Sequence, residues 1–245
     1  MQNRDAQKPK RRISFRFVLV LGVLAFILVI LLLSPIFHIR QIDIIGNYII
    51  TDREILDISE LSVGMNIFTF NGRRIAGQID SLPYSAGVSI LRELPDRVII
   101  QINERSPVAN IRLGNTSTYL LIDGTGMVLA AGQNYTRGLP RMTGLGFGGF
   151  SVGEFLQVDN PGVFNDILLI SDFFALYDFI PDLVNFSNPR DIVIYYGNFE
   201  IAFGNMEDAG RKTRYISAFL QQTDFDRGFL DMRDLANNPR FRLSR

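Results

Sequence analysis

The sequence contains no cysteine, no tryptophan and one histidine among its 245 residues. Without cysteine the chain cannot form a disulfide, a thiol nucleophile or a cysteine-ligated zinc site. A single histidine cannot build a metal site that needs several imidazole ligands. These absences argue against most metal-dependent and triad-based enzymes. The remaining composition, 47% apolar and 20% charged, is that of a folded protein with one or two hydrophobic cores.

The charge balance of zero, with 25 basic and 25 acidic residues, hides a strong asymmetry. Among the first 16 residues Asp5 is the one acidic residue, whereas six are basic: Arg4, Lys8, Lys10, Arg11, Arg12 and Arg16. The remainder of the chain therefore carries a net negative charge. The cationic N-terminal end is therefore a functional segment separate from the part of the chain that folds in water.

A long apolar stretch follows the basic end. From Phe17 to Leu33 the sequence FVLVLGVLAFILVILLL has no polar side chain, and residues 34–37 extend the uncharged stretch to 21 residues. As an α-helix this stretch reaches about 30 Å, the thickness of the hydrocarbon core of a bilayer. No small-residue cleavage pattern precedes Pro35. We therefore predict an uncleaved transmembrane helix over residues 17–37.

The basic residues also predict the orientation of this helix. The cluster lies on the N-terminal flank, against Arg40 alone close to the other flank: Lys8, Lys10, Arg11, Arg12 and Arg16. The positive-inside rule then places residues 1–16 in the cytoplasm and residues 38–245 outside the cell membrane, which the chain crosses once. A nucleic-acid or nuclear-import patch is the alternative, disfavoured because the apolar stretch begins immediately afterwards.

After the membrane helix the sequence predicts a β-α-α-β-β unit. Thr51 and Glu54 fit a capping box at the start of one helix, and Asn71 can cap the next. Alternating apolar residues indicate strands, two of which form a hairpin. The expected elements are a strand over 39–45, helices over 52–59 and 71–82, and strands over 87–91 and 97–103.

From residue 108 onward short strands and turns dominate, with two helices. Periodicity and turn residues predict strands over 119–122, 127–130, 192–196, 199–203 and 229–232, and helices over 161–177 and 206–222. The fold class is therefore α+β. We expect a mixed β domain with helices packed on an antiparallel-rich sheet.

Several short motifs resemble the FtsQ/DivIB family of bacterial cell-division proteins, and the resemblance covers nearly the whole chain. The most specific is INERSPVA at 102–109, which is similar to the family's E-R-x-P-x-A junction. The others are FHIRQIDIIGN at 37–47, LPY at 82–84, LP at 94–95, LIDGTG at 121–126, LP at 139–140 with TG at 143–144, and LDMR at 230–233. The sequence departs from the family at Asp234, where an aromatic residue is common, and at Ser85.

The resemblance implies a membrane anchor followed by a POTRA domain over 38–107 and a β domain over 108–245. It also implies a non-enzymatic scaffold of the divisome, which recruits other division proteins during septum formation and septal peptidoglycan synthesis. The expected partners are bitopic proteins resembling FtsB (DivIC in other lineages) and FtsL, beside the bilayer itself. No cofactor, metal, nucleic acid or small-molecule substrate is expected. Either a single- or a double-membrane envelope fits.

The late strand is the candidate partner-binding segment. Its residues are Phe229, Leu230, Asp231 and Met232, followed by Arg233. A strand at the edge of a sheet offers free N–H and C=O groups to an incoming strand, and Arg233 could hold a carboxylate of the partner. From the residues alone, an internally paired strand with Arg233 in a surface ion pair is an equal alternative. The resemblance favours binding.

Other chemistry is weakly indicated. The glycine-rich residues 144–149 lack the βαβ context of a nucleotide loop, and residues 123–126 lack the further carboxylates of a calcium loop. The acidic pairs Asp224/Asp226 and Asp231/Asp234 could serve a cell-wall glycosidase, although neither lies in a segment that predicts a cleft. The alternatives to a scaffold are a POTRA-type chaperone for secretion or membrane-protein assembly and, less favoured, a membrane-anchored cell-wall enzyme.

Overall fold

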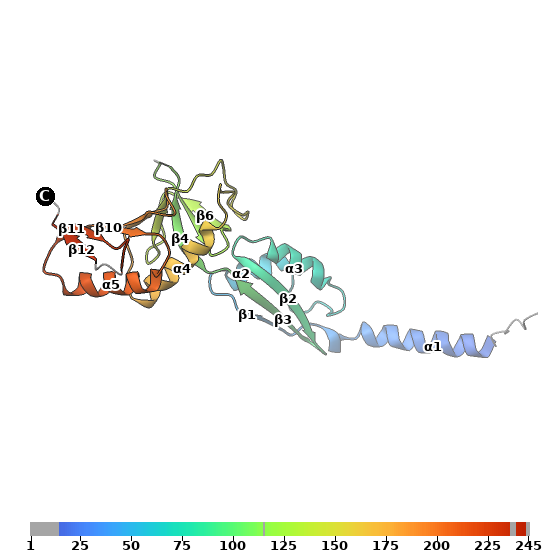
Figure 1. Ribbon diagram of the computed structural model, residues 1–245. Coiled ribbons are helices and arrows are strands. Elements are labelled where there is room, and N and C mark those ends of the chain that lie inside the picture. Colours follow the sequence, from blue (N-terminus) through green and yellow to red (C-terminus); the bar gives the residue numbers. More distant parts are fainter. Residues whose placement is uncertain (1–14, 115, 236–238, 244–245) are drawn as a thin grey trace, which may run out of the picture.

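The computed structural model describes residues 15–114, 116–235 and 239–243. These residues form three parts arranged in a row: an isolated helix, a small three-stranded unit and a larger sheet covered by two helices (Figure 1). The isolated helix lies at one end of this row and the larger sheet at the other.

The isolated helix α1 (Phe15–Leu32) has 18 residues. It ends before the limit of the predicted span, and residues Pro35–Phe37 form the 3₁₀ turn η1 instead. Pro35 accounts for this difference, because proline has no N–H to donate and its ring clashes with the preceding helical turn. No helix within the described residues is both long and apolar enough to qualify as a membrane span. The 18 residues of α1 include Arg16 and correspond to a length of about 27 Å. The hydrocarbon core of a bilayer is about 30 Å thick.

The small unit confirms the predicted β-α-α-β-β order. Its elements are β1 (Gln41–Ile45), α2 (Asp52–Ser59), α3 (Gly72–Asp80), β2 (Ser85–Glu93) and β3 (Arg97–Glu104). The strand order is β1-β3-β2, with β1 parallel and β2 antiparallel to the central strand. The Thr51 hydroxyl accepts the N–H of Glu54, and the Asn71 side chain accepts those of Arg73 and Arg74. The predicted cap residues thus begin both helices.

One face of the small sheet forms a core with the two helices. Alternate residues of β3 point into this core, as their period of two requires. The fully or nearly fully buried members from β3, α2 and α3 are Val98, Ile100, Ile102, Ile55, Ile75 and Ile79.

The larger unit is built on one mixed sheet, in which the described residues form nine strands. They are β4 (Pro107–Arg112), β5 (Tyr119–Asp123), β6 (Val128–Gly132), β7 (Arg141–Thr143), β8 (Leu183–Asn185), β9 (Ile192–Tyr196), β10 (Asn198–Gly204), β11 (Arg227–Asp231) and β12 (Arg240–Arg242). The strand order is β12-β11-β10-β9-β8-β7-β4-β5-β6. Most neighbouring pairs are antiparallel, which confirms the predicted antiparallel-rich sheet.

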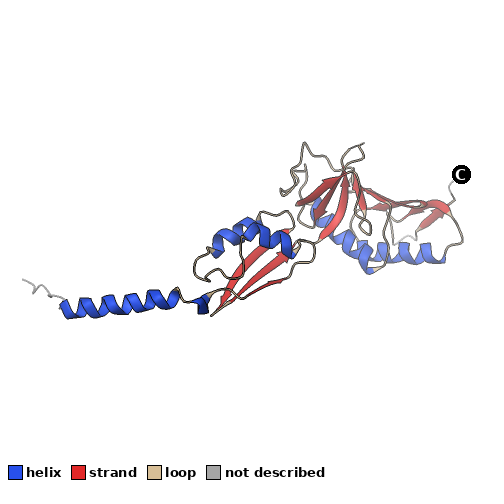
Figure 2. Cartoon of the chain, turned by 180° about the vertical axis from the view of Figure 1, so that it is seen from behind, coloured by secondary structure: helices blue, strands red, loops and turns tan. Residues whose placement is uncertain are grey.

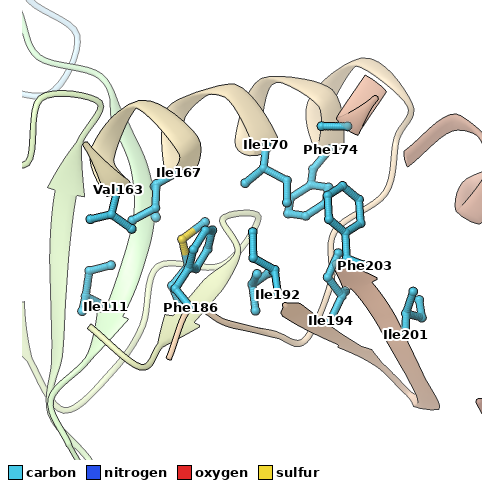
Figure 3. Close-up of a cluster of buried hydrophobic side chains, with 14 of the residues drawn as sticks. Ile111, Val163, Ile167, Ile170, Phe174, Phe186, Ile192, Ile194, Ile201 and Phe203 are labelled. Carbon is cyan, nitrogen blue, oxygen red and sulfur yellow. The ribbon is translucent and has the colours of Figure 1, made fainter. Parts of the chain in front are cut away.

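Two helices, α4 (Val163–Leu176) and α5 (Ala209–Gln222), lie on one face of this sheet (Figure 2). Both begin two or three residues later than predicted. Asn160 does not cap α4 directly, because residues 160–165 first form turns with N–H groups bonded three residues back. Figure 3 shows α4 side chains pointing towards the strands, and the buried residues labelled there are Ile111, Val163, Ile167, Ile170, Phe174, Phe186, Ile192, Ile194, Ile201 and Phe203.

The two faces of α4 differ sharply, which gives a direct test of this core. Ile167 is fully buried, whereas Leu169 is 44% exposed. Ile167→Ala should lower the free energy of unfolding by about 2–5 kcal/mol, because it removes buried methyl groups and leaves a cavity. Leu169→Ala should change it by less than about 0.5 kcal/mol. Urea titrations followed by tyrosine fluorescence would measure both, and equal losses would contradict the packing described.

Candidate functional site

The predicted binding strand lies inside the sheet rather than at its edge. β11 pairs with β10 on one side in parallel and with β12 on the other side in antiparallel orientation. Phe229 is opposite Arg242, and Leu230 is opposite Phe241. The strand that ends the sheet among the described residues is therefore β12, which follows β11 in the chain. The expectation that residues 229–232 leave a free edge is wrong, because the basic C-terminal segment adds one more strand.

The five candidate residues divide between the two faces of the sheet. Leu230 and Met232 are buried in the core beneath the helices and cannot contact a partner. Phe229 and Asp231 alternate with them and are partly exposed on the opposite face. The partner-binding role of Phe229, Asp231 and Arg233, whose side chains are at least partly exposed, stays a prediction.

Arg233 is engaged within the chain. Its Nε and Nη2 donate to the two carboxylate oxygens of Asp231 at 3.0 and 2.8 Å, and its Nη1 lies 3.8 Å from Asp191. The hydrogen bond from Arg233 lowers the pKa of Asp231 below its ordinary value. Arg233 is nevertheless half exposed, so that a carboxylate of a partner could compete for it.

An aromatic cluster packs against one face of the edge strand β12. Phe241 stacks on Phe225 with ring centroids 5.0 Å apart and also contacts Phe219 at 5.2 Å. Gly228 in β11 leaves the space for this ring, because a Cβ there would collide with it. Arg240 and Arg242, on either side of Phe241, point away and are exposed. The edge therefore combines an unpaired main chain with two cationic side chains. In the sequence, this edge strand is indicated by the short alternation Arg-Phe-Arg alone.

A second feature is the junction between the two units, carried by Glu104 and Arg105. The Glu104 carboxylate accepts the N–H groups of Tyr48, Ile49 and Ile50 at 2.7–2.9 Å, which fixes the loop after β1. Arg105, the next residue, extends towards the larger unit. These are the two residues at the centre of the most specific motif in the sequence.

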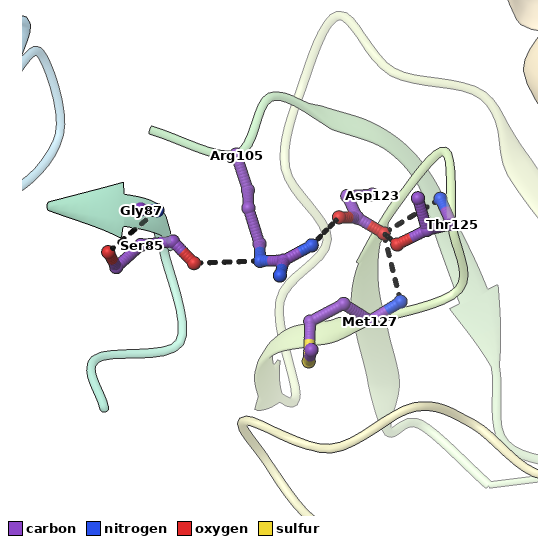
Figure 4. A network of polar contacts seen from close by, with 6 residues as sticks. All are labelled: Ser85, Gly87, Arg105, Asp123, Thr125 and Met127. Carbon is purple, nitrogen blue, oxygen red and sulfur yellow. Dashed lines mark hydrogen bonds and ion pairs between the residues drawn. The ribbon is translucent and has the colours of Figure 1, made fainter. Parts of the chain in front are cut away.

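Arg105 links main chain of the small unit to a carboxylate of the large one (Figure 4). Its Nε donates to the Ser85 carbonyl and its Nη1 to Asp123 Oδ2, both at 2.8 Å. Asp123 is buried, and its other oxygen accepts three bonds from the N–H and hydroxyl of Thr125 and the N–H of Met127. Burial raises the pKa of Asp123, but the hydrogen bonds from Thr125, Arg105 and Met127 outweigh it and lower the pKa. Residues 123–126 thus form the turn between the antiparallel strands β5 and β6.

The alternative chemistries find little support in the geometry. Asp224 lines a cavity of about 540 Å³ with Tyr215, Phe219 and Phe225, and its lining residues include no second carboxylate that could act with it. The other lining residues are Ala218, Gln222 and Thr223. No group of three or more His, Asp or Glu side chains is placed to hold a metal ion within the described ranges.

Comparison with known proteins identifies the small unit and relates the whole chain to cell-division proteins. The family model of the FtsQ-type POTRA domain matches residues 37–105. The cell division protein DivIB of Clostridium tetani is 28% identical over 79% of this chain and 74% of its own length. DivIB of Clostridium botulinum is 25% identical over 98% of this chain and 94% of its own. The cell division protein FtsQ of Syntrophotalea carbinolica is 33% identical over 39% of this chain and 34% of its own.

The hydrogen bonds that hold the Asp123 carboxylate predict a dependence of stability on pH. Because its pKa is lower in the folded state, its carboxylate stabilises the fold above the ordinary pKa of about 3.9. This contribution is lost as the pH falls through the lowered value. Asp123→Asn should cost about 1–3 kcal/mol at pH 7 and progressively less below about pH 4. Urea unfolding at pH 7 and in acid would measure it, with the exposed Asp224→Asn as the control. An Asp123→Asn deficit that stays constant in acid would contradict this role.

Proposed function

Because the chain belongs to the FtsQ/DivIB family of cell-division proteins, with an FtsQ-type POTRA domain, we propose that it is a non-enzymatic scaffold of the divisome. The observation that carries the proposal is the match to a DivIB protein along almost the full length of both chains. A similarity limited to the POTRA domain would leave the role of the β domain open. Here the match extends over both units of this chain.

The scaffold role requires a surface for partners, and the β12 edge is the best candidate. A partner segment that adds an antiparallel or parallel strand there would satisfy the unpaired N–H and C=O groups of β12. Arg240 and Arg242 would favour a segment with carboxylates, because both side chains are exposed and positively charged. Asp231 of β11 lies opposite Arg240 in the sheet, so a partner carboxylate would share Arg240 with it. The expected partners are bitopic divisome proteins of the FtsB/DivIC and FtsL type.

The proposed location is the cell membrane at the division septum. Residues 17–37 would anchor the chain, residues 1–16 would lie in the cytoplasm, and the POTRA domain (38–107) and β domain (108–245) would lie outside. Support comes from the apolar side chains of α1, which from Phe17 to Leu32 are exposed all round the helix. A helix that is apolar on every side is stable when lipid or protein surrounds it. The basic cluster at residues 8–16 supports the orientation.

Localisation in living cells tests the role directly. A fluorescent protein fused to the N-terminus should accumulate at midcell in dividing cells, because a divisome scaffold assembles where the septum forms. Fluorescence microscopy would show this, with growth on the fusion as sole copy as the control for function. A functional fusion distributed evenly around the envelope would overturn the division role and redirect attention to a POTRA-type chaperone.

Charge reversal on the edge strand tests the binding surface. The double variant Arg240→Glu/Arg242→Glu should lose the ability to support division while remaining folded, because both side chains are exposed and repel an acidic partner after the change. Arg53→Glu on α2, also highly exposed, is the matched control and should divide normally. Complementation and co-purification of partners would be measured at equal protein abundance. Normal partner capture by the double variant would exclude this edge as the binding surface.

A further inference from the structure

The loop between α2 and α3 is tied to the segment that follows α1. Ile39 donates its N–H to the Met65 carbonyl, and Gly64 donates its N–H back to the Ile39 carbonyl, both at 2.8 Å. Ile67 donates to the Phe37 carbonyl at 2.9 Å. These three main-chain bonds hold residues 63–67 against residues 37–39 as in a short strand pair.

The same loop also contacts the end of α1 itself. The side-chain amide of Asn66 donates to the carbonyl of Leu32, the last residue of α1, at 2.8 Å. This carbonyl is one of those that the helix cannot satisfy internally. The ring of Phe68 lies 5.1 Å from that of Phe37. The loop therefore has a fixed position beside the helix terminus.

The hairpin tip between β2 and β3 lies at the same end of the domain. The Asp96 carbonyl accepts the N–H groups of Arg40 and Gln41, and the Asp96 carboxylate lies 3.5 Å from the Arg40 guanidinium. Both views of the chain show α1 leaving the POTRA domain at this end (Figures 1 and 2). Two separate parts of the domain thus surround the start of the extracytoplasmic chain.

Large apolar side chains are exposed at this end, where a water-facing domain surface would favour polar ones. Val63 is 66% exposed, Phe68 43% and Leu94, at the hairpin tip, 59%. Between them and α1 lie Leu33 and Ile36, exposed by 65% and 51%. We call these five residues the membrane-proximal cluster. They come from three segments, and the bonds described above join the loop and the hairpin tip to residues 32–41, which distinguishes these residues from scattered exposed ones.

We propose that the membrane-proximal cluster inserts into the interface of the bilayer that holds α1, so that the POTRA domain rests on the membrane in a fixed orientation. The inference rests on the proposed membrane anchor. The bilayer is the occupant because the cluster is continuous with α1, and lipid surrounds both when α1 is anchored. Aromatic and aliphatic side chains beside a helix end are suited to this interfacial region. Because the inserted groups are apolar, binding requires no anionic lipid.

The absence of tryptophan makes the proposal directly measurable, because each single-tryptophan variant reports on one position. The full chain would be reconstituted in phosphatidylcholine vesicles with or without bromine on the acyl chains, which quenches tryptophan in contact with lipid. Phe68→Trp and Leu94→Trp should show blue-shifted emission and a loss of intensity with brominated lipid. Phe150→Trp, in the β domain and 38% exposed, is the control and should show neither.

A fourth variant, Phe26→Trp in α1, separates this inference from the membrane anchor. If Phe26→Trp is quenched and both Phe68→Trp and Leu94→Trp are not, the anchor stands and the insertion is overturned. If none of the three is quenched, the anchor itself fails and the insertion with it. Quenching at position 68 or 94 that appears after addition of anionic lipid alone would replace apolar insertion by charge attraction. Circular dichroism would verify that each variant is folded, and two POTRA positions keep the test valid if one substitution disturbs the loop.

Discussion

The contact between Arg105 and Asp123 connects the two globular units of the chain, each of which has its own hydrophobic core. One guanidinium bonds both a carbonyl of the POTRA domain and a carboxylate of the β domain. Asp123 is in turn held by the turn between β5 and β6. Breaking this link would leave a buried carboxylate with fewer donors, which is costly in a poorly solvated site. The orientation of the two units therefore depends on a small number of directional bonds.

Apolar packing supports the same junction. Tyr84 of the POTRA domain packs against a small cluster on the face of the large sheet away from the main core, formed by Leu121, Met127 and Leu129. Glu104, one residue before Arg105, holds a loop of its own domain. Of these two adjacent residues, Glu104 therefore binds the POTRA domain and Arg105 reaches the β domain. This arrangement accounts physically for the specificity of the motif, because neither carboxylate nor guanidinium can be exchanged without leaving polar groups unpaired.

The POTRA domain was largely predictable because its signals are local. Thr51 and Asn71 begin their helices by contacts within three residues, and the alternation in β3 identifies its buried face. The β domain was less predictable, because its short strands are defined by distant partners. β11 pairs in parallel with β10 across the whole of α5, and β12 is a three-residue strand that pairs with β11 across residues 232–239. A pattern of three residues carries too little periodicity to indicate a strand, so the true edge of the sheet was missed. The residues of β11 were correctly located in a strand, yet their accessibility depended on that missing neighbour.

The linear arrangement of the three parts has a consequence for assembly. α1 lies at one end of the row and β12 at the other, with the POTRA domain between them (Figure 1). If α1 is embedded in the bilayer, the β12 edge is held away from the lipid surface by the full length of the POTRA domain. A partner that is itself rooted in the same bilayer then needs a stiff extracytoplasmic spacer of matching reach before its own strand begins, since a flexible one would lose entropy on spanning the gap. The length of the POTRA domain would thereby select partners by the distance between the membrane surface and their binding segment.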